Sequence, residues 1–307
     1  MEKQELKAYF FVSVAILAWG SSAAVAKLLV GSGLEPAQTI FFTSLIATTV
    51  LFFLALFQNK LAFFRQYCLK DYLKMAFTGF WGFQVYLLCF YSAITLMSAQ
   101  ETYIINYLWP IAVVLFASAV LKERLGFKKL VALIISFLGV VIVATKGNAF
   151  SFHLESYQGV VLAVVAAMAY GLFSVLDKKF GYEKVVENLF FYLANLVTVT
   201  TILIFTKKFI WFDSLNLQQL TGLMWMGTVV AVMGSVFWLL ALKHGNTARM
   251  SGLIFLAPFV SLIYIRFLVG EKILVSSVTG LVIIVFGILV QSVDFGELFL
   301  RASKYFR

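Results

Sequence analysis

Apolar residues fill long uninterrupted stretches of this chain, and charged residues are confined to the short segments between them. A helix needs about 20 apolar residues to cross a hydrocarbon core of ~30 Å. Ten charge-free stretches approach or exceed that length: Ala8 to Ala26, Pro36 to Asn59, Met75 to Gln100, Thr102 to Leu121, Leu130 to Thr145, Ser156 to Leu176, Asn188 to Thr206, Ser214 to Leu242, Met250 to Ile265 and Ile273 to Val293. The pattern predicts an all-α integral membrane protein with ten transmembrane helices.

The composition supports this prediction and excludes several kinds of chemistry. The 307 residues are 62% hydrophobic and 12% charged, unlike a soluble domain. The first stretch is too long for a signal-peptide core and lacks a small-residue cleavage pattern, so we expect it to be retained. Cys68, Cys89, His153 and His244 are too few for a disulfide framework or a zinc site. We therefore expect no metal or cofactor.

The net charge of +10 reports topology and not a nucleic-acid partner. With the N-terminus inside, 18 lysines and arginines fall in the inner segments, five fall in the outer segments, and Arg266 lies within a stretch. Basic residues favour the cytoplasmic side of a membrane. The sequence therefore predicts a multi-pass protein of the cell membrane with both termini in the cytoplasm.

The chain also repeats itself. A shift of 148 residues aligns, without a gap, Gly79 with Gly227, Ala93 with Ala241, Pro110 with Pro258, Glu123 with Glu271 and Gly139 with Gly287. "AWGSSAAVAK" from Ala18 likewise resembles "AYGLFSVLDK" from Ala169. We predict two five-helix repeats, residues 1–146 and 147–307.

A repeat with an odd number of helices must enter the membrane in opposite directions in its two copies. The predicted repeats are therefore inverted, and this places Glu123 inside and its counterpart Glu271 outside. Inverted repeats are common in transporters, because exchanging the conformations of two similar halves moves one central site between the two faces.

Three segments resemble a known family. "AWGSSAAVAK" with Pro36 behind it, "YLWPIAVVLFASAVLKERL" and "ALKHGNTARMSGLIFLAPFVSLIYIRFLVGEKI" are similar to the EamA-type members of the drug/metabolite transporter superfamily. The resemblance implies ten helices in two inverted repeats around a central cavity, and many members are exporters. "INYLWP" and "HGN" further resemble the aromatic amino acid exporters. The arginine that members often carry after the proline of the second helix is absent, since Phe41, Phe42 and Thr43 stand there.

"INYLWP", residues 105–110, gathers polar, aromatic and helix-breaking residues within an apolar stretch. Pro110 deletes a helical hydrogen bond and so frees the carbonyl of Asn106. Thr102, Asn106 and Trp109 follow helical spacing, and Tyr103 lies beside them. An unpaired amide in hydrocarbon is costly, so we expect this face to look into a cavity or to bridge to a neighbouring helix. Pro258 predicts a matching kink that frees the carbonyl of Ile254.

Further aromatic residues near the expected midplane could stack a substrate or simply pack: Trp19, Trp81, Tyr170 and Trp238. Trp19 and Tyr170 occupy matching places in the two repeats, beside Gly20 and Gly171. Gln84 and Asn195 are mid-span amides that favour bonds between helices.

Three ionisable residues leave two interpretations each. Glu101 either complements the dipole of the fourth helix or acts in gating or proton coupling. Arg266 either snorkels or steers a substrate carboxylate. His244 either ends the eighth helix as a polar turn or senses protons. No predicted span has an acid near its middle, and the chain has no phosphate-binding glycine loop, so facilitated export or exchange is the simplest expectation.

The sequence thus predicts a non-enzymatic transporter, with no nucleic-acid partner, that exports amino acids or related small metabolites. Other cargoes, such as a nucleobase, sugar, polyamine or drug, stay open, as does a scaffold without cargo. A membrane-embedded enzyme would need clustered nucleophiles, acids or metal ligands, which the sequence does not show. The oligomeric state is open.

Overall fold

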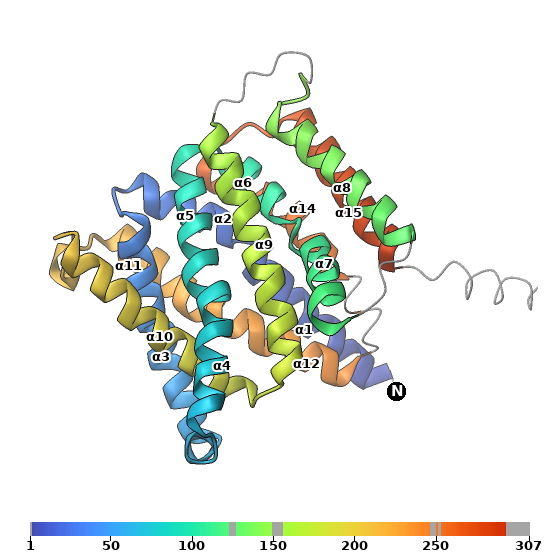
Figure 1. The fold of residues 1–307 in the computed structure, drawn as a ribbon. Coiled ribbons are helices and arrows are strands. Elements are labelled where there is room, and N and C mark those ends of the chain that lie inside the picture. Colours follow the sequence, from blue (N-terminus) through green and yellow to red (C-terminus); the bar gives the residue numbers. More distant parts are fainter. Residues whose placement is uncertain (1, 123–126, 149–155, 246–249, 251–252, 293–307) are drawn as a thin grey trace, which may run out of the picture.

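The computed structural model describes residues 2–122, 127–148, 156–245, 250 and 253–292, and its elements in these ranges are helices (Figure 1). Within these ranges, seven helices of at least 18 residues are long and apolar enough to cross a membrane. Three shorter apolar helices, Val131–Ala144, Ile254–Val269 and Val275–Val290, complete the set. The predicted fold class, an all-α membrane protein of ten helices, is confirmed.

Several spanning helices consist of more than one segment, and segments of the same spanning helix are joined below by 'with'. The spanning helices of the first half are α1 (Glu2–Gly20) with α2 (Ser22–Gly31), α3 (Pro36–Phe57), α4 (Leu69–Gly79) with η2 (Phe80–Val85) and α5 (Tyr86–Leu96), α6 (Ala99–Asn106) with α7 (Trp109–Leu121), and α8 (Phe127–Ala144). In the second half they are α9 (Tyr157–Phe180), α10 (Lys184–Phe205), α11 (Leu217–Met224) with η4 (Trp225–Met233) and α12 (Gly234–His244), η5 (Ile254–Leu256) with α14 (Ala257–Tyr264) and η6 (Ile265–Val269), and α15 (Val275–Ser292). The turns η1 (Leu61–Arg65) and η3 (Phe212–Ser214) lie in the connections.

Equivalent helices of the two halves pack against equivalent partners. The segment α1 packs against α12 and α14, and its counterpart α9 packs against α5 and α7. The pairs α3 with α10 and α8 with α15 each join equivalent helices (Figure 1). The last pair approaches closely at Gly139 and Gly280, where an added Cβ would meet the carbonyl of the other glycine at 2.7 Å. Small residues permit such close helix packing in membranes.

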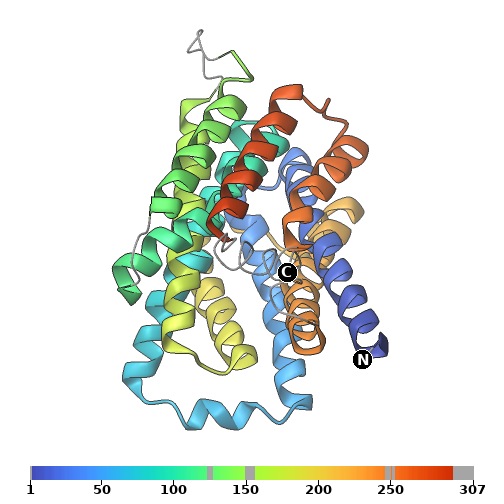
Figure 2. The same cartoon turned by 90° about the vertical axis from the view of Figure 1, so that its right-hand side faces the viewer.

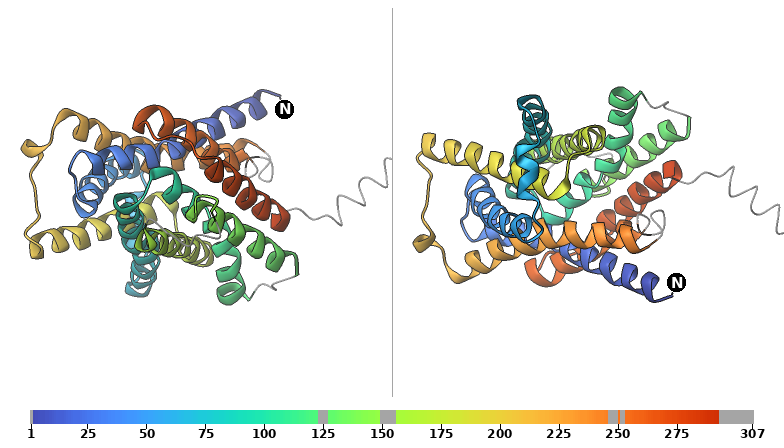
Figure 3. Two further views of the ribbon diagram at one scale, coloured as in Figure 1. Left: turned by 90° about the horizontal axis from the view of Figure 1, so that it is seen from above. Right: turned by 90° about the horizontal axis from the view of Figure 1, so that it is seen from below.

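Each half contributes helices to both of two bundles. Seen along the long axis, the blue and orange helices α1, α12 and α14 lie on one side, and the teal and green helices α5, α7 and α9 lie on the other (Figure 3). Figure 2 shows the same separation from the side. We refer to the face that holds the N-terminus as the N-side and to the opposite face as the far side.

Matching helices depart from α geometry at matching positions. Wide π turns occupy Phe80–Val85 in the third helix and Trp225–Met233 in the eighth. The repeat shift of 148 residues takes Phe80 to the position of Thr228, and Thr228 lies inside the second π segment. Such segments are uncommon and often mark functional positions. Between these breaks, Asn195 donates to the hydroxyl of Ser44 at 2.8 Å and so joins α10 to α3, as expected for a bond between helices.

Candidate substrate site

The fourth helix is broken at the predicted position, but more completely than a kink. The segment α6 ends at Asn106, and α7 restarts at Trp109 with Pro110 in its first turn. The Tyr107 N–H bonds back to the carbonyls of Tyr103 and Ile104, which closes a tight turn. Asn106 and Trp109 therefore belong to separate segments and not to one continuous face. Proline without an N–H explains why the helix stops here and starts again.

Asn106 is buried within protein and faces away from lipid. Its side chain is 6% exposed, and all eight residues of α6 are buried. The Oδ1 atom of Asn106 has no hydrogen-bond partner among the described residues, and the hydroxyl of Tyr86 lies near the same side chain. A buried amide oxygen without a donor is costly, so this atom is available to a polar ligand.

Next to the break, three aromatic rings from three helices meet. The Trp109 ring lies edge-on to the ring of Tyr170 at 5.3 Å, and Tyr170 lies 4.9 Å from the ring of Tyr86. Gly171 allows this approach, because a Cβ there would lie 2.9 Å from the backbone of Ala112. The structure thus brings Trp109 and Tyr170 together with Asn106.

The other bundle holds a second aromatic pair. Trp19 and Trp238 pack at 6.2 Å between ring centroids, and the Trp19 indole sits against Gly234, where an added Cβ would meet its Nε1 at 2.5 Å. Tyr103 links this pair to the fourth helix, since its hydroxyl donates to the carbonyl of Trp19 at 3.2 Å.

The second proline position has a partner that the sequence did not reveal. Pro258 stands in the first turn of α14, and the carbonyl of Ile254 four residues earlier accepts a bond from the Tyr107 hydroxyl at 2.9 Å. The carbonyl freed by the proline of one half is therefore satisfied from the broken helix of the other half.

Three predicted site residues make contacts other than those with the aromatic cluster. The Trp81 ring contacts Phe77 and Phe80, and its buried Nε1 has no partner in the part of the chain that the structure describes. Arg266 is exposed on η6, which favours snorkelling over substrate steering. His244 ends α12 with its ring 5.8 Å from that of Phe11, as in the polar-turn interpretation.

Glu101 caps its own helix. Its carboxylate accepts bonds from the Ser98 N–H and hydroxyl, and the Ser98 oxygen accepts from the Glu101 N–H. The Lys146 ammonium lies 3.9 Å from the other carboxylate oxygen. This reciprocal capping is the structural alternative that the sequence left open.

On the far side, two charged side chains bind the ends of neighbouring helices. The Glu271 carboxylate accepts from the N–H groups of Ala99 and Gln100, at the start of α6. Lys27 donates at 2.8 Å to the carbonyls of Ile94 and Met97, at the end of α5. Charges of these signs complement the helix dipoles at those ends.

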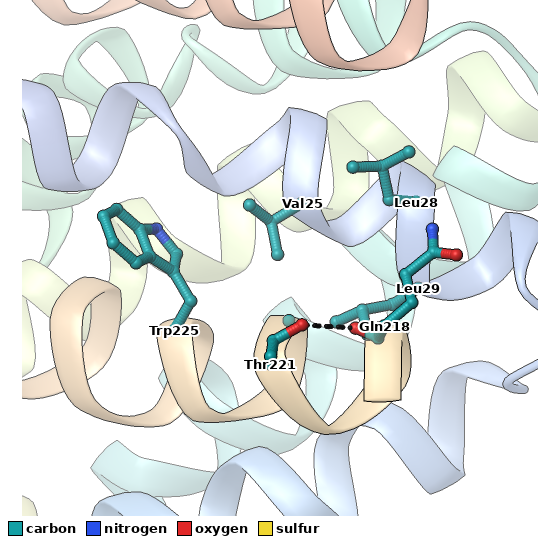
Figure 4. A pocket seen from close by; sticks show the side chains of 7 residues that line it. Val25, Leu28, Leu29, Gln218, Thr221 and Trp225 are labelled. Carbon is teal, nitrogen blue, oxygen red and sulfur yellow. Dashed lines mark hydrogen bonds between the residues drawn. The ribbon is translucent and has the colours of Figure 1, made fainter. Parts of the chain in front are cut away.

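A shallow hollow of about 200 Å³ lies elsewhere, between α2 and the start of the eighth helix (Figure 4). Val25, Leu28, Leu29, Gln218, Thr221, Gly222 and Trp225 line it. None of the predicted site residues is among them, and its lining is mostly apolar.

The sequence matches a known protein family over most of its length. The model of the EamA-like transporter family matches residues 6–145 and again residues 157–293. The chain belongs to this family. The family model thus matches two successive segments of the chain.

Among the relatives of this EamA-like transporter is an uncharacterized transporter of Clostridium kluyveri, 23% identical over 93% of both chains. The uncharacterized transporter YyaM of Bacillus subtilis is 24% identical over 72% of both chains. The aromatic amino acid exporter YddG of Ancylobacter novellus is 24% identical over 60% of this chain and 63% of its own. A solved crystal structure shares the fold, with a TM-score of 0.66 at 20% identity over 94% of this chain and 96% of that chain.

Proposed function

We propose that this transporter exports amino acids, with aromatic amino acids as preferred cargo, by alternating access between its two bundles. One observation carries the proposal: the Asn106 amide oxygen has no donor among the described residues, and its side chain lies near the Tyr86 hydroxyl. The Tyr86 ring in turn contacts Tyr170 of the Trp109–Tyr170 ring pair. The oxygen can accept a hydrogen bond from a cargo ammonium group, and the rings can stack on an aromatic side chain or hold the ammonium. The relative YddG is named as an exporter of such cargo.

The structure offers moving parts suited to this function. The break between α6 and α7 permits the two segments to move separately, and the inverted repeat provides a second break at Pro258. In our proposal the far-side contacts of Glu271 and Lys27 hold one gate shut while cargo enters from the N-side. Exchange of the conformations of the halves would then open the far side.

The proposal places the protein in the cell membrane with both termini in the cytoplasm. The distribution of basic residues supports this orientation. Trp19, Trp238 and Tyr103 would line the route on the other bundle, and Trp81 would support the third helix.

Transport by purified protein in proteoliposomes tests the proposal. A panel of labelled amino acids should show counterflow of phenylalanine or tryptophan well above that of leucine or lysine. Trp109→Ala and Asn106→Ala should each lower this counterflow at least tenfold, because one loses the stacking ring and the other the ammonium acceptor. Trp211→Ala is the matched control, since Trp211 is 72% exposed and lies outside the cluster.

Counterflow that is equal in the parent and in both site variants would remove the site assignment. Absence of counterflow for every amino acid in the panel would remove the cargo assignment.

A further inference from the structure

A buried carboxyl group lies where the sequence predicts a loop. Glu187 falls outside the predicted span, which begins at Asn188, but α10 begins at Lys184 and takes Glu187 into its first turn. Glu187 is 1% exposed. The reason is the short connection after α9, where Gly181 adopts a left-handed conformation with φ of 63° and turns the chain back on itself.

This turn brings two acids and one base together. The Lys184 ammonium lies 2.6 Å from the Asp177 Oδ1 and 2.9 Å from the Glu187 Oε2. Both carboxylates bind this one ammonium group, so the two acids are close neighbours. With both acids ionised, the group would carry one uncompensated negative charge in a region where charge is costly.

One carboxylate oxygen of this cluster lacks a hydrogen-bond donor and is the expected position of a bound proton. The Glu187 Oε1 is buried and has no donor among the described residues. Two neighbouring carboxylates disfavour ionisation of both, and one proton held between them removes the repulsion and can satisfy the orphaned oxygen. Asp177 is 27% exposed on its side chain and connects the site with the N-side solvent.

Capping of the helix does not account for Glu187. The start of α10 is already capped by Glu183, whose carboxylate accepts from the Val186 N–H at 2.9 Å. Glu183 is also paired with Lys60 at 2.7 Å. Glu187 is therefore left for the cluster alone.

The other ionisable groups around this cluster have partners of their own or stay neutral. The Tyr182 hydroxyl donates to Asp71, and burial together with the Asp71 and Glu187 carboxylates raises the pKa of Tyr182 to about 12, so it stays neutral. On the packed elements, Asp71 is paired with Lys74 at 3.8 Å, and Lys60 is paired with Glu183. Arg65 on η1, Lys70 on α4 and Lys178 and Lys179 on α9 are further cations on these elements.

We propose that Asp177 and Glu187 form a proton-binding site, in which the two carboxyl groups share one proton and Lys184 neutralises the remaining charge. Asp177 lies two helical turns after Tyr170 on the same face of α9, and Tyr170 contacts Trp109. Gain or loss of the proton therefore changes the charge on the helix that carries the aromatic cluster. Proton binding at this site is therefore coupled to transport. The coupling, unlike the proton site itself, rests on the proposed function.

Infrared spectroscopy of the purified protein in lipid tests the proton site without any cargo. Difference spectra between acid and alkaline pH should contain the C=O band of a protonated carboxyl group that is retained at neutral pH. Glu187→Gln should abolish this band, and Glu35→Gln should leave it intact, because Glu35 is 43% exposed and paired with Lys208. In Asp177→Asn, Lys184 neutralises Glu187 alone, and the band at neutral pH should again be lost.

A band that persists in both Glu187→Gln and Asp177→Asn, or that is absent from the parent, overturns the proton site. Coupling is tested separately in proteoliposomes with the best cargo of the counterflow panel. An imposed pH gradient should drive severalfold accumulation in the parent, whereas Glu187→Gln should keep counterflow and lose accumulation. A parent that shows the band and counterflow but no response to the gradient keeps the proton site and overturns the coupling.

Discussion

At the scale of single residues, the fit between the helices depends on glycines that face the other elements of their bundle. A Cβ at Gly171 would lie 2.9 Å from backbone atoms of Ala112 and Val113, and a Cβ at Gly20 would lie 3.2 Å from the carbonyl of Ala257. The two positions match in the repeats. Backbone atoms cannot move aside as a flexible side chain can, so these positions tolerate little added volume.

Gly171→Ala should therefore lower stability by about 1–3 kcal/mol, because the α7 backbone must shift. Thermal unfolding in detergent measures this effect. Gly31→Ala is the control, since a Cβ there meets nothing within 4 Å. Equal unfolding temperatures for parent and Gly171→Ala would contradict the close approach of α9 and α7.

A second residue-scale prediction concerns the hydrogen bond from Tyr107 to Ile254. Tyr107→Phe leaves a buried carbonyl without its donor and should cost about 1–3 kcal/mol. In a Pro258→Ala background the restored N–H at position 258 can bond the same carbonyl, and the cost of Tyr107→Phe should become smaller. A double-mutant cycle of unfolding free energies measures the difference. Equal costs in the two backgrounds would show that the proline does not create the need for the tyrosine.

At the scale of elements, hydrophobic length predicts the ten helices, because hydrocarbon imposes one long apolar run per crossing. Proline chemistry predicts where the fourth and ninth helices change. The sequence did not predict that the fourth helix divides into α6 and α7, that π turns interrupt the third and eighth helices, or that α10 extends back to Lys184. These features depend on side chains of other helices that pack against the irregular segments. Such contacts cannot be recognised from the local sequence.

The candidate site was predictable to a similar degree. Asn106, Trp109 and Tyr170 could be chosen from spacing and repeat position. The structure brings the rings of Trp109 and Tyr170 together, and Tyr86 lies between Tyr170 and the Asn106 side chain. Tyr86 was missed because one tyrosine among many apolar residues looks like packing. Tyr107 stands within the motif of residues 105–110, but its bond to the carbonyl of Ile254 was not foreseen. Glu187 was missed because a charge at the end of a span looks like a loop residue.

The capping of α6 by Glu271 gives a prediction at this scale. Glu271→Ala removes the acceptor for the Ala99 and Gln100 N–H groups, so the start of α6 should open more often. Hydrogen exchange of the peptide that covers Ala99 to Asn106 should become faster. Glu35→Ala, which removes an acid on the same side that is paired with Lys208, should leave that peptide unchanged. Unaltered exchange in Glu271→Ala would contradict the role of the cap.

At the scale of the whole molecule, each half contributes helices to both bundles. The helices α1 and α9 are equivalent in the repeat but lie in different bundles, each packed against helices of the other half. Exchange of the two conformations would therefore move the bundles relative to each other around the region of Asn106. On the far side the described contacts of Glu271, Gln100 and Lys27 hold the ends together.

Pulsed electron paramagnetic resonance distances test this account most directly. After Cys68 and Cys89 are replaced by alanine, spin labels on Ala119 and Lys243 report the N-side, and labels on Thr95 and Leu268 report the far side. Each pair joins the two bundles at exposed positions. On addition of the best cargo from the counterflow panel, the account predicts that one distance shortens while the other lengthens. Distances that both stay constant, or that change in the same direction, in protein that still transports would contradict alternating access between the bundles.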